Sequence, residues 1–295
     1  MTEFMTEVPV SPYIGTVQLK PQDYKSDVKP IWCPGCGDFG VLSSFYKAIA
    51  DLGIPPENAV IASGIGCSGR FPAFVEAYGF HGVHGRVLPL ATGIKLARPD
   101  LVVVAVGGDG DAFSIGAGHL PHAARRNVDI TYIVMDNEIY GLTKGQPSPT
   151  SPHALERKAS PYGHAEYPIN PVLMALAYGA TFVARGFSAR PREVTELIKQ
   201  GISHKGFAFI QIYSPCVTFY DTYDHFRQVT ADLPADHDPS DKAAAMRLAM
   251  EDEVLYLGVF YKENRPSFVE SLQAVRTRAA AKPFDLQDLI NRYRS

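Results

Sequence analysis

Short apolar runs alternate with longer segments of helical pattern between Trp32 and Cys216. The strand candidates are the runs Ala59 to Ala62, Leu101 to Val106, Ile130 to Met135, Thr181 to Ala184 and Phe207 to Tyr213. Alternating β and α units predict a doubly wound, mostly parallel sheet that helices cover on both faces. The uninterrupted run Leu-Val-Val-Val-Ala-Val at 101–106 is typical of a central strand buried on both sides. We therefore expect an α/β fold.

The regions on either side of this alternation have a different pattern. Residues 1–30 contain four prolines and no sustained periodicity, so we expect an extended N-terminal arm. Residues 31–225 form the predicted main domain. In residues 226–295 the pattern weakens to an Ala-rich helix near Lys242 to Glu251 and a charged tail. We expect these residues to form a C-terminal extension that packs on the same domain or on a partner subunit.

The charge balance argues against several classes of protein. The 28 Lys and Arg residues nearly cancel the 31 Asp and Glu residues, and no basic block stands out, which disfavours a nucleic-acid binder. No apolar run approaches the ~18 residues of a membrane span, and Met1 to Val10 carries two Glu instead of a secretory signal. We expect a cytoplasmic protein. Because the cytosol keeps thiols reduced, we expect its four cysteines to be ligands or redox groups and not structural disulfides.

Three familiar motifs lack the residues that would complete them. Gly64 to Gly69 fits the dinucleotide pattern G-x-G-x-x-G, but no acidic residue occurs between Glu76 and Asp100 to bind a ribose. Cys33-Pro34-Gly35-Cys36 resembles a thioredoxin redox pair, a function that leaves the other two cysteines unexplained. The kinase triplet Asp38-Phe39-Gly40 has no catalytic-loop His-Arg-Asp beside it, so we interpret it as coincidence.

Polar residues follow two consecutive strand candidates. Asp109 comes after the run 101–106, and Asn137 comes after the run 130–135. The separation fits one helical crossover, which would bring both residues to neighbouring strand ends, where open α/β sheets bind ligands. Carboxylate, amide and backbone oxygens suit Mg²⁺, while the nearby glycines and a helix beginning near Ala112 would favour a diphosphate. The alternative is an ordinary pair of strand turns.

This pair resembles the thiamine diphosphate signature, Gly-Asp-Gly followed nearly thirty residues later by Asn. Further motifs occur in the order seen in the β subunit of 2-oxoacid:ferredoxin oxidoreductases, most like the 2-oxoglutarate branch. They are Cys33 to Gly37, Gly64 to Ser68, His84 to Arg86, Gly107 to Asp111, Arg125 to Asn127 and Asp136 to Gln146. The resemblance covers roughly Lys29 to Cys216 and implies the diphosphate-binding type of α/β domain.

The resemblance implies a thiamine diphosphate and Mg²⁺ site in residues 31–225. Asp109, Asn137 and the main chain of Ile139 would hold the Mg²⁺. The residues that would line the thiamine diphosphate are Ile65, Gly66, Cys67, Ser68, His84, Gly110, Asp111, Gly141 and Leu142. His84 would donate to the diphosphate, although a histidine between two glycines is also an ordinary turn residue. Lys144 would pair with a substrate carboxylate, or else be a solvated loop residue.

The resemblance also implies one [4Fe-4S] cluster, which requires four thiolates. The chain has four cysteines, Cys33, Cys36, Cys67 and Cys216, and Cys67 would therefore touch both redox centres. A structural zinc would use the same ligands, but zinc ribbons usually bring a second close pair. His119 and His122 are three apart on a predicted helix and have no evident third ligand, so we interpret them as packing or surface residues.

What the family does requires more than this chain. A partner α subunit would supply the pyrimidine-binding domain, the catalytic glutamate and most coenzyme A contacts, in an (αβ)₂ assembly. The implied reaction converts 2-oxoglutarate, CoA and oxidised ferredoxin reversibly to succinyl-CoA, CO₂ and reduced ferredoxin. Alternatives are a pyruvate or broad 2-oxoacid enzyme, an iron-sulfur electron-transfer subunit without catalysis of its own, and a non-oxidative thiamine decarboxylase, which would need no cysteines.

Overall fold

A mostly parallel sheet forms the centre of the protein in a computed structural model, which describes residues 12–281 and 285–294. In the described residues this sheet has eight strands in the order β2-β1-β3-β4-β8-β7-β10-β9. The strands are β1 (Ala59–Ser63), β2 (Tyr78–His81), β3 (Val102–Gly108), β4 (Ile130–Asp136), β7 (Phe182–Phe187), β8 (Phe207–Tyr213), β9 (Thr230–Asp232) and β10 (Leu255–Lys262). Within the described part of this sheet, β10 pairs antiparallel with β7, and the other neighbouring strands are parallel. The predicted doubly wound α/β fold is confirmed.

The central strands bury side chains on both faces. In β3, Val102, Val104 and Val106 belong to one apolar cluster, while Val103 and Ala105 belong to another on the opposite face. Successive side chains of a strand point to opposite sides, so an uninterrupted apolar run fits only where both sides are covered. All five predicted strand runs overlap strands of this sheet, and β8 has the predicted bounds, whereas Leu101 and Thr181 lie one residue before β3 and β7.

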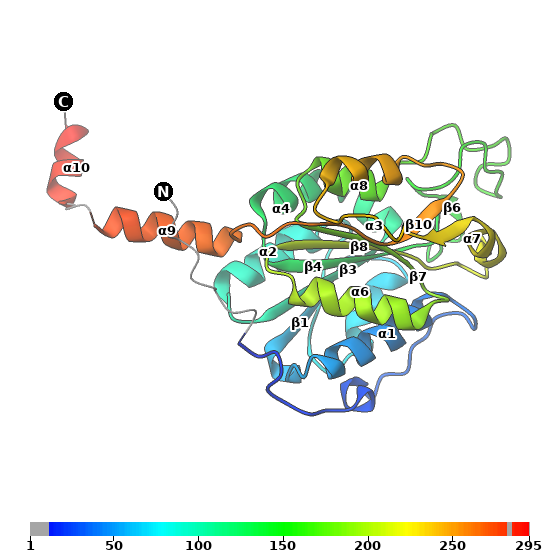
Figure 1. The fold of residues 1–295 in the computed structure, drawn as a ribbon, viewed down its shortest axis with the longest axis horizontal. Helices are drawn as coiled ribbons and strands as arrows, with labels where there is room; N and C mark the ends of the chain where they lie inside the picture. The colour runs from blue at the N-terminus through cyan, green and yellow to red at the C-terminus, as the bar shows by residue number, and fades with distance from the viewer. Residues whose placement is uncertain (1–11, 282–284, 295) are drawn as a thin grey trace.

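Helices supply the two covering layers (Figure 1). The α-helices are α1 (Asp38–Asp51), α2 (Val87–Ala97), α3 (Asp109–Phe113), α4 (Leu120–Arg126), α5 (Pro171–Ala177), α6 (Pro191–Ser203), α7 (Tyr223–Val229), α8 (Lys242–Ala249), α9 (Phe268–Ala280) and α10 (Leu286–Arg292). Short 3₁₀ helices are η1 (Pro21–Tyr24), η2 (Pro56–Asn58), η3 (Ser68–Phe74) and η4 (Ala117–His119). Helices α1 and α6 pack together on one face, and α2, α4, α5 and α8 contribute to the core on the other.

The two ends of the chain behave differently. Residues 12–30 lie against the body, where Tyr24 is fully buried and donates its hydroxyl to the carbonyl of Ile54 at 2.7 Å. Residues 1–11 of the expected arm lie outside the described residues. Residues 226–262 include β9 and β10, which complete one edge of the sheet. Beyond them α9 and α10 project away from the body and contain no buried residue (Figure 1).

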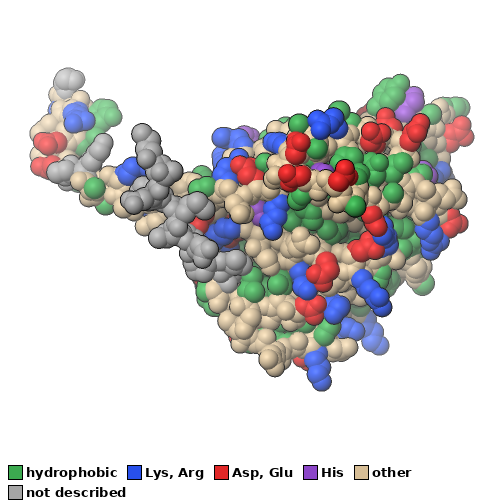
Figure 2. All heavy atoms as spheres, viewed as in Figure 1, with side chains coloured by type: hydrophobic (Ala, Val, Ile, Leu, Met, Phe, Trp, Pro, Cys, Tyr) green, Lys and Arg blue, Asp and Glu red, His purple; other side chains and the backbone are tan. Residues whose placement is uncertain are grey.

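Two surface features bear on function. Acidic and basic side chains are interspersed on the face shown in Figure 2, as the near balance of charge suggests. None of the helices that the structure describes is long and apolar enough to cross a membrane.

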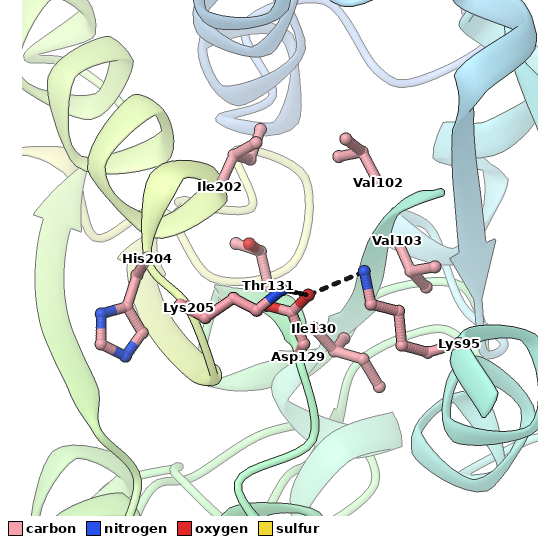
Figure 3. A pocket seen from close by; sticks show the side chains of 9 residues that line it. All are labelled: Lys95, Val102, Val103, Asp129, Ile130, Thr131, Ile202, His204 and Lys205. Atoms are coloured by element: carbon pink, nitrogen blue, oxygen red, sulfur yellow. Dashed lines mark ion pairs between the residues drawn. The ribbon is translucent and has the colours of Figure 1, made fainter. Parts of the chain in front are cut away.

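A small cavity of about 20 Å³ lies where β3 and β4 begin (Figure 3). Beside it the ammonium of buried Lys95 is 2.8 Å from Asp129, and the ring of His204 is bonded to the hydroxyl of Thr181. Burial lowers the pKa of His204 to about 4, so this histidine is neutral near pH 7. This cavity has room for about one water molecule and is too small for a cofactor or substrate.

Candidate active site

A second cavity, of about 410 Å³, lies at the opposite edge, where β1, β3 and β4 end. This is the size of a small-molecule site. Its lining residues are Ile65, Gly66, Cys67, Ser68, His84, Gly108, Asp109, Gly110, Asp111, Asn137, Ile139, Tyr140, Gly141, Leu142, Thr143 and Gln146. The structure thus brings every residue predicted to contact thiamine diphosphate or Mg²⁺ to one cavity. Strands β3 and β4 are adjacent and parallel, which places Asp109 and Asn137 side by side.

Asp109 is a buried carboxylate held by hydroxyl groups. Ser148 and Thr150 both donate to its Oδ2, and Thr150 is also 2.8 Å from Oδ1 of Asp136. Gln211 donates to the other oxygen of Asp136 at 2.7 Å. Burial, and then the nearby Asp136 charge, raises the pKa of Asp109 above its usual range. Asp109 and Asp136 are therefore buried close together at the strand ends, and a cation between them and the cavity would compensate their negative charge.

A tight turn after β4 fixes the positions of Asn137 and Ile139. Asn137 accepts a hydrogen bond from the backbone N–H of Ile139 at 3.0 Å, and Glu138 between them has a left-handed φ of 58°. Such a φ is uncommon outside glycine. Ile139 then enters β5 (Ile139–Tyr140), which pairs with β6 (Gln146–Pro147) in a short hairpin. The hydroxyl of Tyr140 reaches back to the carbonyl of Gly110 at 3.2 Å, which closes the cavity between the two strand ends.

Asp111 uses one oxygen to hold two loops. Its Oδ1 accepts from the backbone N–H groups of Ile65 at 2.8 Å and Gly85 at 2.7 Å, and lies 2.8 Å from Nδ1 of His84. A Cβ on Gly64 would lie 1.9 Å from Oδ2, so only glycine fits there. With Nδ1–H donating to Asp111, Nε2 of His84 can donate to an anion only when the ring is doubly protonated. Asp111 thus orients His84, the residue predicted to donate to the diphosphate.

The first cysteine pair lies in a tight turn. The N–H of Cys36 bonds to the carbonyl of Cys33 at 3.0 Å, with Pro34 second and Gly35 third in the turn. Gly35 has a φ of +85°, the conformation that a type II turn requires at this position. The indole of Trp32 donates to the carbonyl of Cys67 at 2.7 Å, which fastens this turn to the second cysteine loop.

The cysteine loops meet beside the cavity. A Cβ on Gly141 would lie 3.5 Å from Sγ of Cys216 and 3.6 Å from Sγ of Cys67, so both sulfur atoms flank the same point. Burial raises the pKa of the Cys67 thiol to about 11, and the charges of Asp38, Cys216 and Cys33 act in the same direction. Burial also raises the pKa of Cys36, with contributions from Asp38, Cys216 and Cys67. None of the four cysteines forms a disulfide bond.

Other predicted residues lie outside the cavity wall. Lys144 is exposed with a φ of 86°, and its N–H bonds to the carbonyl of Gly141, so it lies in the loop beside the cavity. His119 ends η4 and His122 lies in α4. Helix α3 has five residues and begins at Asp109. The expected start near Ala112 was therefore wrong, and Asp109 itself belongs to the first turn of the helix.

Several polar residues of the site were not predicted from the sequence. Ser148 and Thr150 lie about forty positions after Asp109, in a loop rich in Ser and Pro, and no local pattern links them to a strand end. Gln211 lies inside β8, where a polar residue in an apolar strand was the available signal. Asp38 was set aside with the kinase triplet, yet it is 1% exposed.

Comparisons with known proteins agree with this geometry. A family model described as "Thiamine pyrophosphate enzyme, C-terminal TPP binding domain" matches residues 64–212. A second model, for the C-terminal part of the "Pyruvate ferredoxin oxidoreductase beta subunit", matches residues 216–277. The "2-oxoacid:ferredoxin oxidoreductase 2, subunit beta" of Aeropyrum pernix is 42% identical over 86% of this chain and 87% of that protein. The chain belongs to the β subunits of the 2-oxoacid:ferredoxin oxidoreductases.

Other members of this oxidoreductase family are equally similar. The "2-oxoglutarate synthase subunit KorB" of Methanocaldococcus jannaschii is 42% identical over 82% of this chain and 91% of that protein. A solved structure of "2-oxoglutarate:ferredoxin oxidoreductase from Magnetococcus marinus with 2-oxoglutarate, coenzyme A and succinyl-CoA bound" superposes with a TM-score of 0.91 and 46% identity. The match covers 96% of this chain and 99% of that one. The family resemblance in the sequence is therefore confirmed.

Proposed function

We propose that this β subunit takes part in oxidative decarboxylation of 2-oxoglutarate, giving succinyl-CoA, CO₂ and reduced ferredoxin, in a reversible reaction. Several similar proteins have 2-oxoglutarate in their names, and the superposed structure contains 2-oxoglutarate and succinyl-CoA. The observation that carries the proposal is that one cavity brings together the oxygen ligands at two strand ends and a cysteine loop. The family model for pyruvate enzymes, which matches residues 216–277, supports pyruvate as the second candidate substrate.

Thiamine diphosphate with Mg²⁺ fits the cavity. Asp109, Asn137 and the carbonyl of Ile139 would hold the Mg²⁺, and the buried charge of Asp109 and Asp136 is what a cation would compensate. When bound, the cofactor supplies the carbon nucleophile that attacks a 2-oxoacid. Ser148 and Thr150 fix the Asp109 carboxylate, since their hydroxyls occupy Oδ2. Residues 65–68, together with Gly141 and Leu142, also line this cavity and would exclude water from the bound cofactor.

A [4Fe-4S] cluster fits the four thiols better than zinc does. In the described ranges, no three His, Cys, Asp or Glu side chains are arranged to hold a single metal ion. Thiolates of a cluster bind separate iron atoms, so they need not converge on one point. Cys67 lines the cofactor cavity and flanks Gly141 together with Cys216. With both groups bound, Cys67 would hold the cluster beside the cofactor cavity, and the cluster would supply one-electron transfer toward ferredoxin.

His84 and Lys144, at and beside the cavity, would bind different groups. His84, oriented by Asp111, would donate to the diphosphate. Lys144, in the loop that follows Gly141, would pair with the substrate carboxylate. The described residues form one large sheet, so the pyrimidine-binding domain and the catalytic glutamate would come from an α subunit, in an (αβ)₂ assembly that also takes CoA. A cytoplasmic location stays a prediction.

Two reciprocal variants test the paired sites in the anaerobically purified αβ complex. Asp109→Ala should weaken Mg²⁺-dependent thiamine diphosphate binding by about a hundredfold or more, since loss of an outer partner of a ligand already costs about 10- to 100-fold. Its iron content should stay unchanged. Cys216→Ser should lose iron and keep cofactor affinity, because Cys216 does not line the cavity. Calorimetry and iron analysis measure the two properties separately.

The same complex separates the alternatives. Wild-type cofactor affinity in Asp109→Ala would contradict the Mg²⁺ site, and full iron content in Cys216→Ser would contradict the cluster. Absence of bound thiamine diphosphate from a complex that contains iron would favour an electron-transfer module. Ferredoxin reduction with 2-oxoglutarate, pyruvate and other 2-oxoacids then identifies the substrate, and a clear preference for pyruvate would overturn the first candidate.

A further inference from the structure

Asp38, the first residue of α1, is a buried carboxylate that the proposed reaction leaves without a role. Its Oδ1 accepts a hydrogen bond from Ser214 at 2.6 Å, and its Oδ2 accepts one from Ser68 at 3.1 Å. All three side chains are at most 3% exposed. Among the described residues, Asp38 forms no salt bridge. The carboxylate is therefore held by the two hydroxyls.

Each of these groups belongs to a different cysteine loop. Asp38 follows Cys36 by two residues, Ser68 follows Cys67 directly, and Ser214 precedes Cys216 by two. One carboxylate therefore joins three segments that are 30 and 176 positions apart in the chain. A shift of one of these loops relative to the others would break a buried hydrogen bond of Asp38.

The backbone around Asp38 has little freedom to adjust. The N–H of Gly37 bonds to the carbonyl of Pro215 at 3.1 Å, and a Cβ on Gly37 would lie 2.6 Å from the backbone of Ser214. The first and third cysteine loops are thus in direct backbone contact. The carboxylate of Asp38 completes this contact and extends it to the second loop through Ser68.

The carboxylate of Asp38 lies beside the cysteine loops. Asp38 follows Cys36 by two residues and is hydrogen-bonded to Ser68, which directly follows Cys67, and to Ser214, two residues before Cys216. A negative charge at this position would oppose the arrival of an electron at a cluster held by these cysteines. Hydrogen bonds and nearby charge are among the main protein influences on cluster potential.

We propose that Asp38 is a positioning residue that holds the three cysteine loops in the spacing of a [4Fe-4S] cluster and lowers the reduction potential of that cluster. This inference rests on the proposed cluster. Ser68 also lines the cofactor cavity, so the same carboxylate connects the spacing of the cluster loops to the wall of the thiamine diphosphate site. Asp38 would contact neither the thiamine diphosphate nor the cluster and would act through Ser68 and Ser214.

Two substitutions separate shape from charge in the anaerobically purified αβ complex. Asp38→Asn keeps the size and removes the charge, so the cluster should assemble with a higher reduction potential in an electron paramagnetic resonance titration. Asp38→Ala removes both hydrogen bonds, so iron should be lost to a chelator about tenfold faster or more, as expected for loss of charge-assisted bonds. Thiamine diphosphate affinity by calorimetry should change little in Asp38→Asn.

Matched variants show whether the effect is specific. Asp129→Asn removes a partly buried carboxylate, which pairs with Lys95 at the opposite edge of the sheet, and should leave the cluster potential and the rate of iron loss unchanged. Ser214→Ala should accelerate iron loss in the wild type and much less in Asp38→Ala, because the two residues act through one hydrogen bond.

The outcomes distinguish this inference from the function on which it rests. A wild-type complex without iron would overturn both. A wild-type complex with a full cluster, together with Asp38 variants of unchanged potential and unchanged iron loss, would overturn the role of Asp38 alone. If Asp38→Ala does not fold, the potential of Asp38→Asn decides.

Discussion

Asp109 and Asp111 lie two residues apart at one strand end and have different environments. Hydroxyl groups hold Asp109 beside a second buried acid, Asp136. Backbone N–H groups and His84 hold Asp111, which therefore shapes the cavity loops. The spacing of the sequence placed both residues at the cavity, but the division of their tasks follows from which donors the folded chain brings to each carboxylate.

Lys144 offers a test at the scale of one residue. Lys144→Met keeps the apolar stem and removes the charge, so loss of a charge-assisted bond worth ~1.5 to 3 kcal/mol should raise the KM for 2-oxoglutarate by about ten- to a hundredfold. Steady-state kinetics of the αβ complex measure this change. Lys20→Met, at another exposed lysine, serves as the control and should leave KM unchanged. Equal KM values for both variants would leave Lys144 as a solvated loop residue.

At the scale of elements, the strongest apolar runs became the central strands, and the edges of the sheet were harder to predict. All four residues of β2 are exposed, so its sequence has no buried face to produce a pattern. Strand β10 joins antiparallel to β7 with an irregular register near Gly258 to Tyr261, after the alternation of β and α units has ended. Edge strands are defined by their neighbours more than by their own periodicity.

The loop after β1 offers a test at this scale. Gly64→Ala would place a Cβ 1.9 Å from Oδ2 of Asp111, so the carboxylate must move and lose its bonds to Ile65 and Gly85. We expect weaker thiamine diphosphate binding by calorimetry and a lower melting temperature. Gly93→Ala is the matched control, because its Cβ meets nothing within 4 Å in helix α2. That control should raise stability by roughly 0.5 to 1 kcal/mol, whereas normal cofactor affinity in Gly64→Ala would contradict the role of Asp111.

At the scale of the whole molecule, we propose that the cavity is one half of an active site that the α subunit completes. Its lining residues come from the ends of β1, β3 and β4 and the loops that follow them, and the described chain has one large sheet. Helices α9 and α10 extend from the body without any buried side chain. Both features are consistent with a protein that functions in contact with a partner.

Dependence on that partner is the prediction at this scale. The β subunit expressed alone should release no CO₂ from 2-oxoglutarate, because the described residues form one large sheet and we propose that the α subunit supplies the glutamate for the aminopyrimidine. Addition of the α subunit should restore CO₂ release and ferredoxin reduction. Release of labelled CO₂ from 2-oxoglutarate measures both states, and turnover by the rigorously purified single chain would show that the site is complete without the α subunit.

Local sequence patterns were sufficient to predict the central strands, the adjacency of Asp109 and Asn137 and the supply of four thiols. The strands follow from periodicity, the adjacency of the two residues from the rule that parallel strands end at one edge, and the thiols from the cysteine count. Folding established what those patterns could not, namely that Ser148 and Thr150 hold Asp109. The same is true of the two serine hydroxyls that hold Asp38, one of them 176 positions away. Hydrogen-bond partners of buried acids depend on how the crossovers pack against the sheet, and no local pattern records that packing.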